Sequence, residues 1–152
     1  ELEKAKILLE NISGMKPAET RTQKRIPTWG LRPNLVIGCK VTIRGEKAEK
    51  LLATLLQAKD NALPAYSFDT FGSFSFGVKE YLEIPNMNYI PEVGIMGLEV
   101  AVTLKRKGFR VKHRALRQRG IPLRHAIKKE EAMAFARDTF HLTIIEREEA
   151  ES

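Results

Sequence analysis

The sequence predicts an α+β fold in which an antiparallel β-sheet has helices packed on one face and long basic loops at its edges. Three segments alternate apolar and polar residues, as strands with one buried face do. Three other segments repeat apolar residues at the spacing of a helix. The helices and strands do not alternate regularly along the chain, which favours an α+β fold over an alternating α/β fold.

The predicted helices cover residues 1–13, 46–59 and 128–140. The first ends where Gly14 and Pro17 supply stop signals. The expected buried positions of the three helices, in chain order, are Ala5, Leu8, Leu9 and Ile12; Ala48, Leu51, Leu52, Leu55 and Leu56; and Met133, Ala136 and Phe140.

The predicted strands cover residues 35–44, 73–84 and 98–105, and a turn at Lys107-Gly108 predicts a further paired strand over 109–112. Side chains alternate between the two faces of a strand, so each strand has an inward set. These sets are Leu35, Ile37, Cys39, Val41 and Ile43; Phe74, Phe76, Val78, Leu82 and Ile84; and Leu98, Val100, Val102 and Leu104. The opposite face of the first strand, which carries Lys40, Thr42 and Arg44, is expected to stay open.

A chain of 152 residues predicts one domain, here over residues 1–145, followed by an acidic tail at 146–152. The sequence begins with Glu rather than Met, so we expect it to begin inside a longer chain. No apolar run approaches the ~18–20 residues that cross a bilayer. The single cysteine, Cys39, fits a reducing compartment, and a cytoplasmic location is expected.

The charge distribution is more informative than the net charge of +7. Residues 105–129 contain eleven Lys or Arg and no acid, and residues 16–44 contain seven cations against Glu19 alone. Residues 130–152 instead contain seven acids and only two cations. Cations without neighbouring acids predict an anionic partner, either a phosphate backbone or a membrane surface.

Nothing in the sequence predicts an enzyme. His113, His125 and His141 have no metal-ligand spacing with one another or with Cys39. There is no phosphate-binding loop, and no nucleophile accompanies the acids near Asp69. We therefore expect no catalytic residue, no metal and no cofactor.

Nucleic acid is favoured over a membrane because Gly120 and Pro122 interrupt the basic segment, which cannot form the amphipathic helix that membrane docking prefers. RNA is favoured over DNA because no helix has the pattern of a basic recognition helix. The RNA-recognition motif's aromatic residues are also missing, so we expect folded RNA to be recognised through its shape and backbone.

Several blocks of the sequence then resemble the ribosomal protein L5 family. They are SGMKP at 13–17, IGCKVTIRG at 37–45 and FDTFGSFSFGVKE at 68–80. GIMGLEV at 94–100, IPLRH at 121–125 and KEEA at 129–132 are similar to the archaeal and eukaryotic branch of that family.

The resemblance implies a structural constituent of the large ribosomal subunit that binds 5S rRNA in the central protuberance. The implied 5S contacts are Met15, Lys16, Lys40, Thr42 and Arg44. Met15 stands where relatives have glutamine, and a thioether cannot donate the hydrogen bonds of an amide. Lys16 is then expected to supply a phosphate contact instead. The resemblance also implies a further N-terminal strand, which contacts 5S rRNA in the family and is missing from this sequence. The other implied partners are 23S-type rRNA, neighbouring large-subunit proteins and a protein of the small-subunit head.

The resemblance also implies that the loop at 25–33 contacts P-site tRNA through Arg25, Thr28, Trp29 and Arg32. Trp29 either reaches the tRNA or packs back on the core, since tryptophan is highly buried on average. General contacts to the rRNA backbone are expected from Lys105, Arg106, Lys107, Arg110, Lys112, Arg114, Arg117, Arg119 and Arg124. The alternative is a free-standing RNA chaperone or RNA-binding regulator that acts outside the ribosome.

Overall fold

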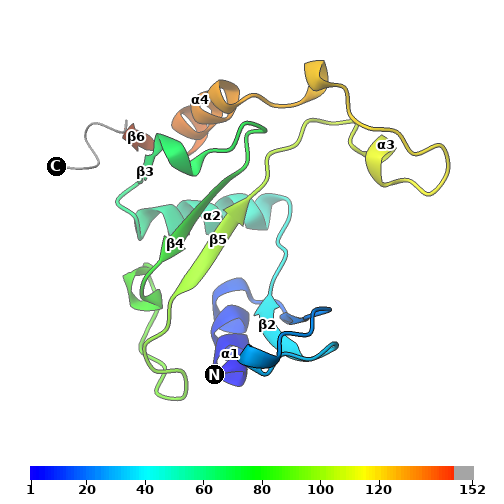
Figure 1. The fold of residues 1–152 in the computed structure, drawn as a ribbon. Helices are drawn as coiled ribbons and strands as arrows, with labels where there is room; N and C mark the ends of the chain where they lie inside the picture. The colour runs from blue at the N-terminus through cyan, green and yellow to red at the C-terminus, as the bar shows by residue number, and fades with distance from the viewer. Residues whose placement is uncertain (146–152) are drawn as a thin grey trace. The chain divides into compact units, whose positions relative to one another are not determined.

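The computed structural model describes residues 1–145, so the predicted acidic tail at 146–152 lies outside the described residues. Figure 1 shows the order of helices and strands. Contacts divide the chain into two compact units. The first consists of Glu1–Thr54 and Lys79–Met96, and the second of Leu55–Val78 and the chain from Gly97 onwards. That residues 1–145 behave as one domain remains a prediction.

The first unit begins with helix α1 (Leu2–Ser13), which ends as predicted at Gly14. Gly14 has φ 63°, and its N–H donates to the Glu10 carbonyl at 2.8 Å. This left-handed conformation costs glycine little and closes the last turn of the helix. Three elements follow: strand β1 (Ala18–Arg21), the 3-10 turn η1 (Pro27–Trp29) and strand β2 (Val36–Lys40).

Strands β1 and β2 pair antiparallel, with Ala18 opposite Lys40 and Glu19 opposite Cys39. The sequence did not predict β1, because Ala-Glu-Thr-Arg has no apolar alternation. The prediction that Ile37 is buried was wrong, since its side chain is 52% exposed. The register shifts between Thr20 and Arg21, so Ile37 has no partner in β1. A bulge of this kind leaves the extra residue outside the regular pairing.

Helix α2 (Glu46–Gln57) follows as predicted, and the boundary between the two units falls within it. The predicted strand at 73–84 continues into the first unit as the 3-10 turn η3 (Tyr81–Glu83). The change of period buries Tyr81 and Ile84, three residues apart, and leaves Leu82 38% exposed, so the prediction for Leu82 was wrong. Tyr81 is fully buried, and its hydroxyl accepts a hydrogen bond from the Ile90 N–H at 2.9 Å.

The second unit contains strands β3 (Ala62–Pro64), β4 (Phe74–Val78), β5 (Leu98–Val102) and β6 (Thr143–Ile145). Its helices are α3 (Arg110–His113) and α4 (Lys129–Phe140), with 3-10 turns η2 (Ala65–Ser67) and η4 (Leu123–His125). β4 and β5 pair antiparallel, whereas β3 and β6 pair parallel. The α+β class with antiparallel strand pairs is therefore confirmed. The strands of the described chain are distributed over three two-stranded sheets.

The core of the second unit forms where the sequence placed it on β4, since Phe74, Phe76 and Val78 are all buried. Phe74 also stacks on Phe68, with ring centroids 4.8 Å apart. The turn before β4 approaches α4 so closely that a side chain on Gly72 would lie 3.2 Å from the Cβ of Ala132. A Cβ on Gly72 would also lie 2.7 Å from Cγ2 of Ile127, and Gly72 has φ 76°, so this turn favours glycine.

The predicted strand at 109–112 was wrong, because a turn at Phe109 leads into α3, which occupies 110–113. The backbone bonds are local: the N–H of Lys112 donates to Phe109 at 3.1 Å, and that of Arg114 to Arg110 at 2.9 Å. Two apolar residues in a run of four do not distinguish a strand from a helical turn. None of the described helices is long and apolar enough to cross a membrane.

Candidate nucleic-acid interface

The turn after α1 is held by the hydroxyl of Ser13. This hydroxyl donates to the Leu9 carbonyl at 2.6 Å and accepts from the Met15 N–H at 3.1 Å. Met15 is 38% exposed, and Lys16 is exposed beside it. Because Ala18 lies opposite Lys40, the turn and the end of β2 lie at the same end of the β1–β2 ladder.

Lys40 is exposed on the face of the ladder that α1 does not cover. The covered face is identified by Glu19 and Cys39, which lie opposite each other, because Lys6 on α1 reaches Glu19. Neighbouring residues of a strand point to opposite faces, so Lys40 points the other way. Thr42 and Arg44 are also exposed, but they lie beyond Lys40, where β2 ends, and not on the predicted strand face.

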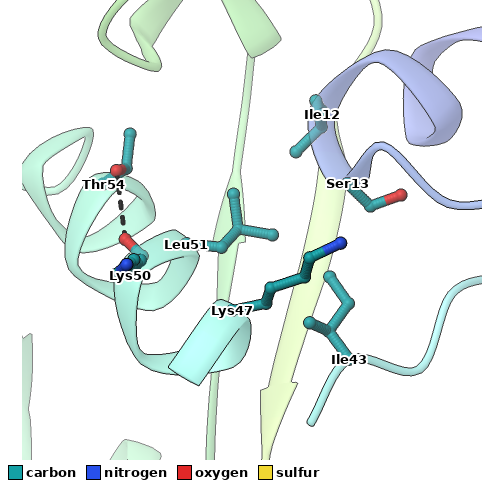
Figure 2. A pocket seen from close by; sticks show the side chains of 7 residues that line it. All are labelled: Ile12, Ser13, Ile43, Lys47, Lys50, Leu51 and Thr54. Carbon is teal, nitrogen blue, oxygen red and sulfur yellow. Dashed lines mark hydrogen bonds between the residues drawn. The ribbon is translucent and has the colours of Figure 1, made fainter. Parts of the chain in front are cut away.

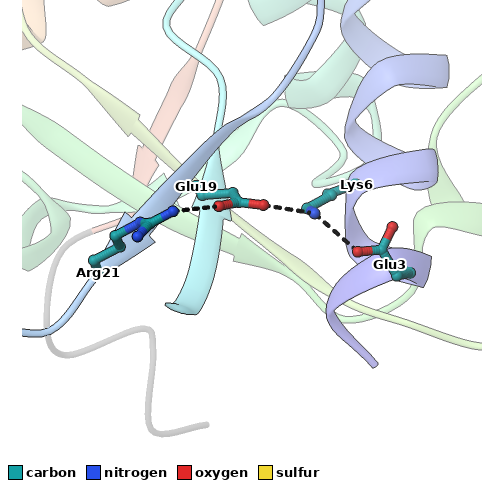
Figure 3. Close-up of polar contacts among 4 residues, drawn as sticks. All are labelled: Glu3, Lys6, Glu19 and Arg21. Carbon is teal, nitrogen blue, oxygen red and sulfur yellow. Dashed lines mark hydrogen bonds and ion pairs between the residues drawn. The ribbon is translucent and has the colours of Figure 1, made fainter. Parts of the chain in front are cut away.

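The single acid of residues 16–44 is engaged within the protein (Figure 3). Lys6 Nζ lies 2.9 Å from both Glu3 Oε1 and Glu19 Oε1, and Arg21 Nη2 lies 3.4 Å from Glu19 Oε2. The hydrogen bonds that Lys6 donates to the two glutamates raise the pKa of Lys6 to about 12, and the bond from Lys6 lowers the pKa of Glu19. Glu19 therefore neutralises Lys6 and Arg21 rather than Lys16 or Lys40.

Cys39 lies on the covered face of β2 and is partly buried. Burial raises the pKa of its thiol, which keeps the thiol protonated and a poor nucleophile. The described residues contain no group of three His, Cys, Asp or Glu side chains that could hold a metal ion.

Residues 26–31, the hairpin tip, close on themselves through backbone hydrogen bonds. Ile26 and Leu31 exchange two bonds of 3.0 Å, and the Gly30 N–H donates to the Pro27 carbonyl at 3.0 Å. Gly30 has φ 64°, a left-handed conformation that a bulky side chain resists. The tip is thus a turn with a fixed backbone.

The hairpin tip presents Trp29, which is 74% exposed, so the possibility that this ring packs on the core is excluded. Thr28 is exposed beside it. Arg25 directly precedes the tip and Arg32 directly follows it, and both are exposed. The hairpin tip therefore carries an exposed indole, and an exposed arginine stands at each of its two ends along the chain.

The nine cations predicted in the basic segment are all exposed. One of them forms an ion pair within the described chain: Arg106 Nη2 lies 2.6 Å from Glu131 Oε1. The segment leaves β5 and returns to α4 in Figure 1, where it is coloured yellow to orange. We call residues 107–125 the basic lobe, because hydrogen bonds fold the outgoing and returning halves against each other.

The first unit contains a hollow of about 300 Å³ that the sequence did not predict (Figure 2). Its lining consists of Ile12, Ser13, Ile43, Lys47, Lys50, Leu51 and Thr54. Lys47 turns its amine toward the end of α1 in Figure 2. The lining combines three apolar side chains with two lysines and two hydroxyls, and it contains no carboxylate, histidine or thiol that could act in catalysis. The only sign of this hollow in the sequence was the pair of lysines, three residues apart on the predicted helix, which would lie on the same face.

Exposed apolar residues in the loops were also missed. Tyr66, Phe71 and Tyr89 are 71%, 58% and 57% exposed, and Leu116 and Leu123 of the basic lobe are 83% and 80% exposed. Sequence periodicity could not identify them, because loops have none.

Comparisons with known proteins agree on one family. The model of the C-terminal region of the ribosomal L5 family matches residues 36–135. The chain is 45% identical over 146 residues to the large ribosomal subunit protein uL5 of Sulfurisphaera tokodaii, covering 95% of this chain and 82% of that protein. It is also 45% identical to the protein of the same name from Nanoarchaeum equitans, covering 95% and 85%. The protein of the same name from Methanosphaera stadtmanae is 38% identical, with 94% and 85% covered.

Proposed function

The chain belongs to the ribosomal L5 family, and from this membership we propose that it binds 5S rRNA in the large ribosomal subunit. The relatives reported above are archaeal, which agrees with the archaeal and eukaryotic branch that the sequence blocks implied. As a member of this family it is a structural, non-enzymatic component of the ribosome, and it is located in the cytoplasm.

One observation carries the proposed 5S site: the register of the β1–β2 ladder sets the Ser13–Lys16 turn beside Lys40. The open face there has exposed cations, while Glu19 is occupied on the covered face. Cations without carboxylate neighbours attract a phosphate backbone, and exposed hydroxyls such as that of Thr42 can donate to it. The backbone N–H of Met15 already donates to the Ser13 hydroxyl. The group of this turn that is proposed to bind a phosphate is therefore the Lys16 amine.

The test replaces Lys40 with Glu and Thr42 with Ala in one variant. We expect 5S rRNA binding to be lost while circular dichroism stays native, because both side chains are exposed. Lys4→Glu is the matched control, since Lys4 is an exposed cation elsewhere in the same unit and should leave binding intact. Full 5S binding by the double variant would move the site elsewhere.

We further propose that the hairpin tip contacts P-site tRNA. Its support is the fixed backbone of the tip together with the protruding Trp29 ring between Arg25 and Arg32. An exposed aromatic ring can stack on an unpaired base or cover a ribose, and the guanidinium groups can bind the adjoining phosphates. Crosslinking in intact ribosomes, with mapping of the attached RNA, tests this contact.

The remaining partners follow from the same reasoning. The basic lobe is proposed to neutralise 23S-type rRNA near 5S rRNA, and contacts with neighbouring large-subunit proteins and a small-subunit head protein complete the set. An RNA chaperone or regulator outside the ribosome would instead bind RNA without preference for 5S rRNA. Gradient sedimentation separates the two: a ribosomal protein travels with large subunits, and a free-standing one stays near the top.

A further inference from the structure

The basic lobe is closed at its base by a histidine. His125 Nε2 lies 2.9 Å from the Lys107 carbonyl oxygen. A carbonyl only accepts hydrogen bonds, so Nε2 carries the proton and donates it. The His125 ring also lies beside Phe109, with ring centroids 6.2 Å apart. This histidine therefore joins the first residues of the lobe to its last.

The interior of the lobe is bonded as well. The Arg119 N–H donates to the Val111 carbonyl at 3.2 Å, which ties the returning half to α3. The Arg114 guanidinium donates twice to the Arg117 carbonyl, at 3.0 and 2.8 Å, and Gln118 donates to the Lys112 carbonyl. These are bonds within the protein that need no RNA partner.

A second connection at the base fixes where the lobe leaves the second unit. Glu131 Oε1 accepts from Arg106 at 2.6 Å, and its other oxygen, Oε2, accepts from the Lys128 N–H at 3.1 Å. One carboxylate thus caps α4 and binds the residue that precedes the lobe. An exposed ion pair contributes little to stability, but it limits the directions that the chain can take.

We propose that the basic lobe is folded before RNA arrives and that His125 is the residue that positions it. Its cations are then already spaced when they meet RNA. A preformed loop avoids the loss of conformational entropy that a disordered basic segment undergoes on binding. His125 acts through Lys107 and Phe109 and need not touch RNA itself. The folding of the lobe does not depend on the proposed function, whereas its effect on RNA affinity rests on it.

Hydrogen exchange on the free full-length chain tests the folding of the lobe without RNA. We expect the amides of Arg114 and Arg119 to exchange more slowly than those of an unfolded chain, because each donates to a carbonyl. His125→Ala should remove this protection while amides of β4 and α4 stay protected. His125→Gln should keep it, since an amide nitrogen can replace Nε2 as the donor to Lys107. Unprotected Arg114 and Arg119 amides in the unaltered protein would overturn the proposal.

RNA binding provides the second readout, with purified large-subunit rRNA that includes 5S rRNA as the probe. His125→Ala keeps every lysine and arginine, so the slope of affinity against salt should not change. The affinity itself should fall roughly threefold to tenfold, the range expected for one hydrogen bond. His125→Gln should recover most of this loss.

Lys112→Gln is the control for charge, because it should lower the salt slope by about one and leave amide protection unchanged. An affinity unaffected by His125→Ala, despite lost protection, would refute the positioning role. If the unaltered protein fails to bind rRNA at all, the proposed function fails, while the exchange result still decides whether the lobe is preformed.

Discussion

The hairpin tip and the basic lobe both present cations to solvent, but different groups hold them closed. In the tip, the backbone of Ile26 and Leu31 supplies the closing bonds. In the lobe, the side chains of His125 and Gln118 supply much of the closure. A turn of four residues can close by backbone geometry alone. A loop that runs from 107 to 125 loses more entropy on closing, and side-chain bonds offset that loss.

The two regions also differ in what they offer to RNA. The tip offers one aromatic ring, Trp29, between two arginines. The lobe offers many cations and no exposed Phe, Tyr or Trp ring. A ring recognises an exposed base or ribose at one place, whereas spaced cations follow a phosphate backbone over a longer distance. Substitutions in the tip should therefore affect one local contact, and those in the lobe the overall salt dependence.

The largest effect is expected from removing charge in the lobe. Replacing Lys112, Arg117 and Arg119 with Gln should lower the salt slope of rRNA binding by roughly three, about one for each lost phosphate contact. Filter binding over a range of potassium chloride concentrations measures it. Lys4→Gln with Lys79→Gln is the control, because both residues are exposed cations of the other unit. An unchanged slope in the triple variant would place the phosphate contacts outside the lobe.

A smaller and more local effect is expected at the tip. Trp29→Ala should weaken tRNA contact by about 1–3 kcal/mol, the range for one stacked base. The free energy of unfolding should change by less than about 0.5 kcal/mol, because an exposed side chain contributes little to stability. Tyr66→Ala, which removes a ring 71% exposed in the other unit, is the control. A clear loss of stability in the Trp29 variant would contradict the exposed position.

The backbone closure of the tip can be strained without removing the ring. Gly30→Val places a β-branched residue at φ 64° and should cost roughly 1–2 kcal/mol. Gly30→Asn should cost less, because asparagine tolerates the left-handed conformation. Fluorescence anisotropy of Trp29, the only tryptophan, reports the mobility of the tip. Equal anisotropy in both variants would show that the closing bonds survive the strain.

The smallest expected effect is that of pH, which should affect the base of the basic lobe and not the hairpin tip. The Lys128 N–H and then Arg106 lower the pKa of Glu131 below its ordinary value. A lowered pKa contributes stability above the ordinary glutamate pKa, and this contribution disappears as the pH falls through the lowered value. Acid should therefore loosen the base of the lobe and leave the tip unchanged, since backbone bonds close the tip. Carboxyl NMR titration of Glu131 measures this, and an ordinary pKa would contradict it.

Much of the fold could be predicted where several apolar residues repeat in a short stretch. Leu52, Leu55 and Leu56 are buried on α2, and Phe74, Phe76 and Val78 on β4, as the patterns indicated. The short elements could not be predicted. The pairing of β3 with β6 joins Leu63 to Ile144, far along the chain, and neither segment is long enough to show a period.

Of the candidate site, the sequence could predict which side chains are exposed but not where all of them lie relative to the strands. The exposure of the cations followed from their charge, because an unpaired charge is rarely buried. The location of Thr42 and Arg44 beyond β2 could not be predicted. Apolar and polar residues alternate past Lys40 in the sequence, but the strand ends at Lys40. Strand pairing ends where the partner ends, and β1 pairs only as far as Lys40.

The sequence by itself determined which segments carry positive charge without acids, where α1 ends, and that Trp29 stands in a turn bounded by Pro27 and Gly30. Only the tertiary structure decided that Glu19 is bound to Lys6, that Trp29 points to solvent, and that His125 closes the basic lobe on Lys107. The physical reason is range. Charge and turn chemistry belong to neighbouring residues, whereas a hydrogen bond between distant residues exists only once the fold has brought its two atoms together.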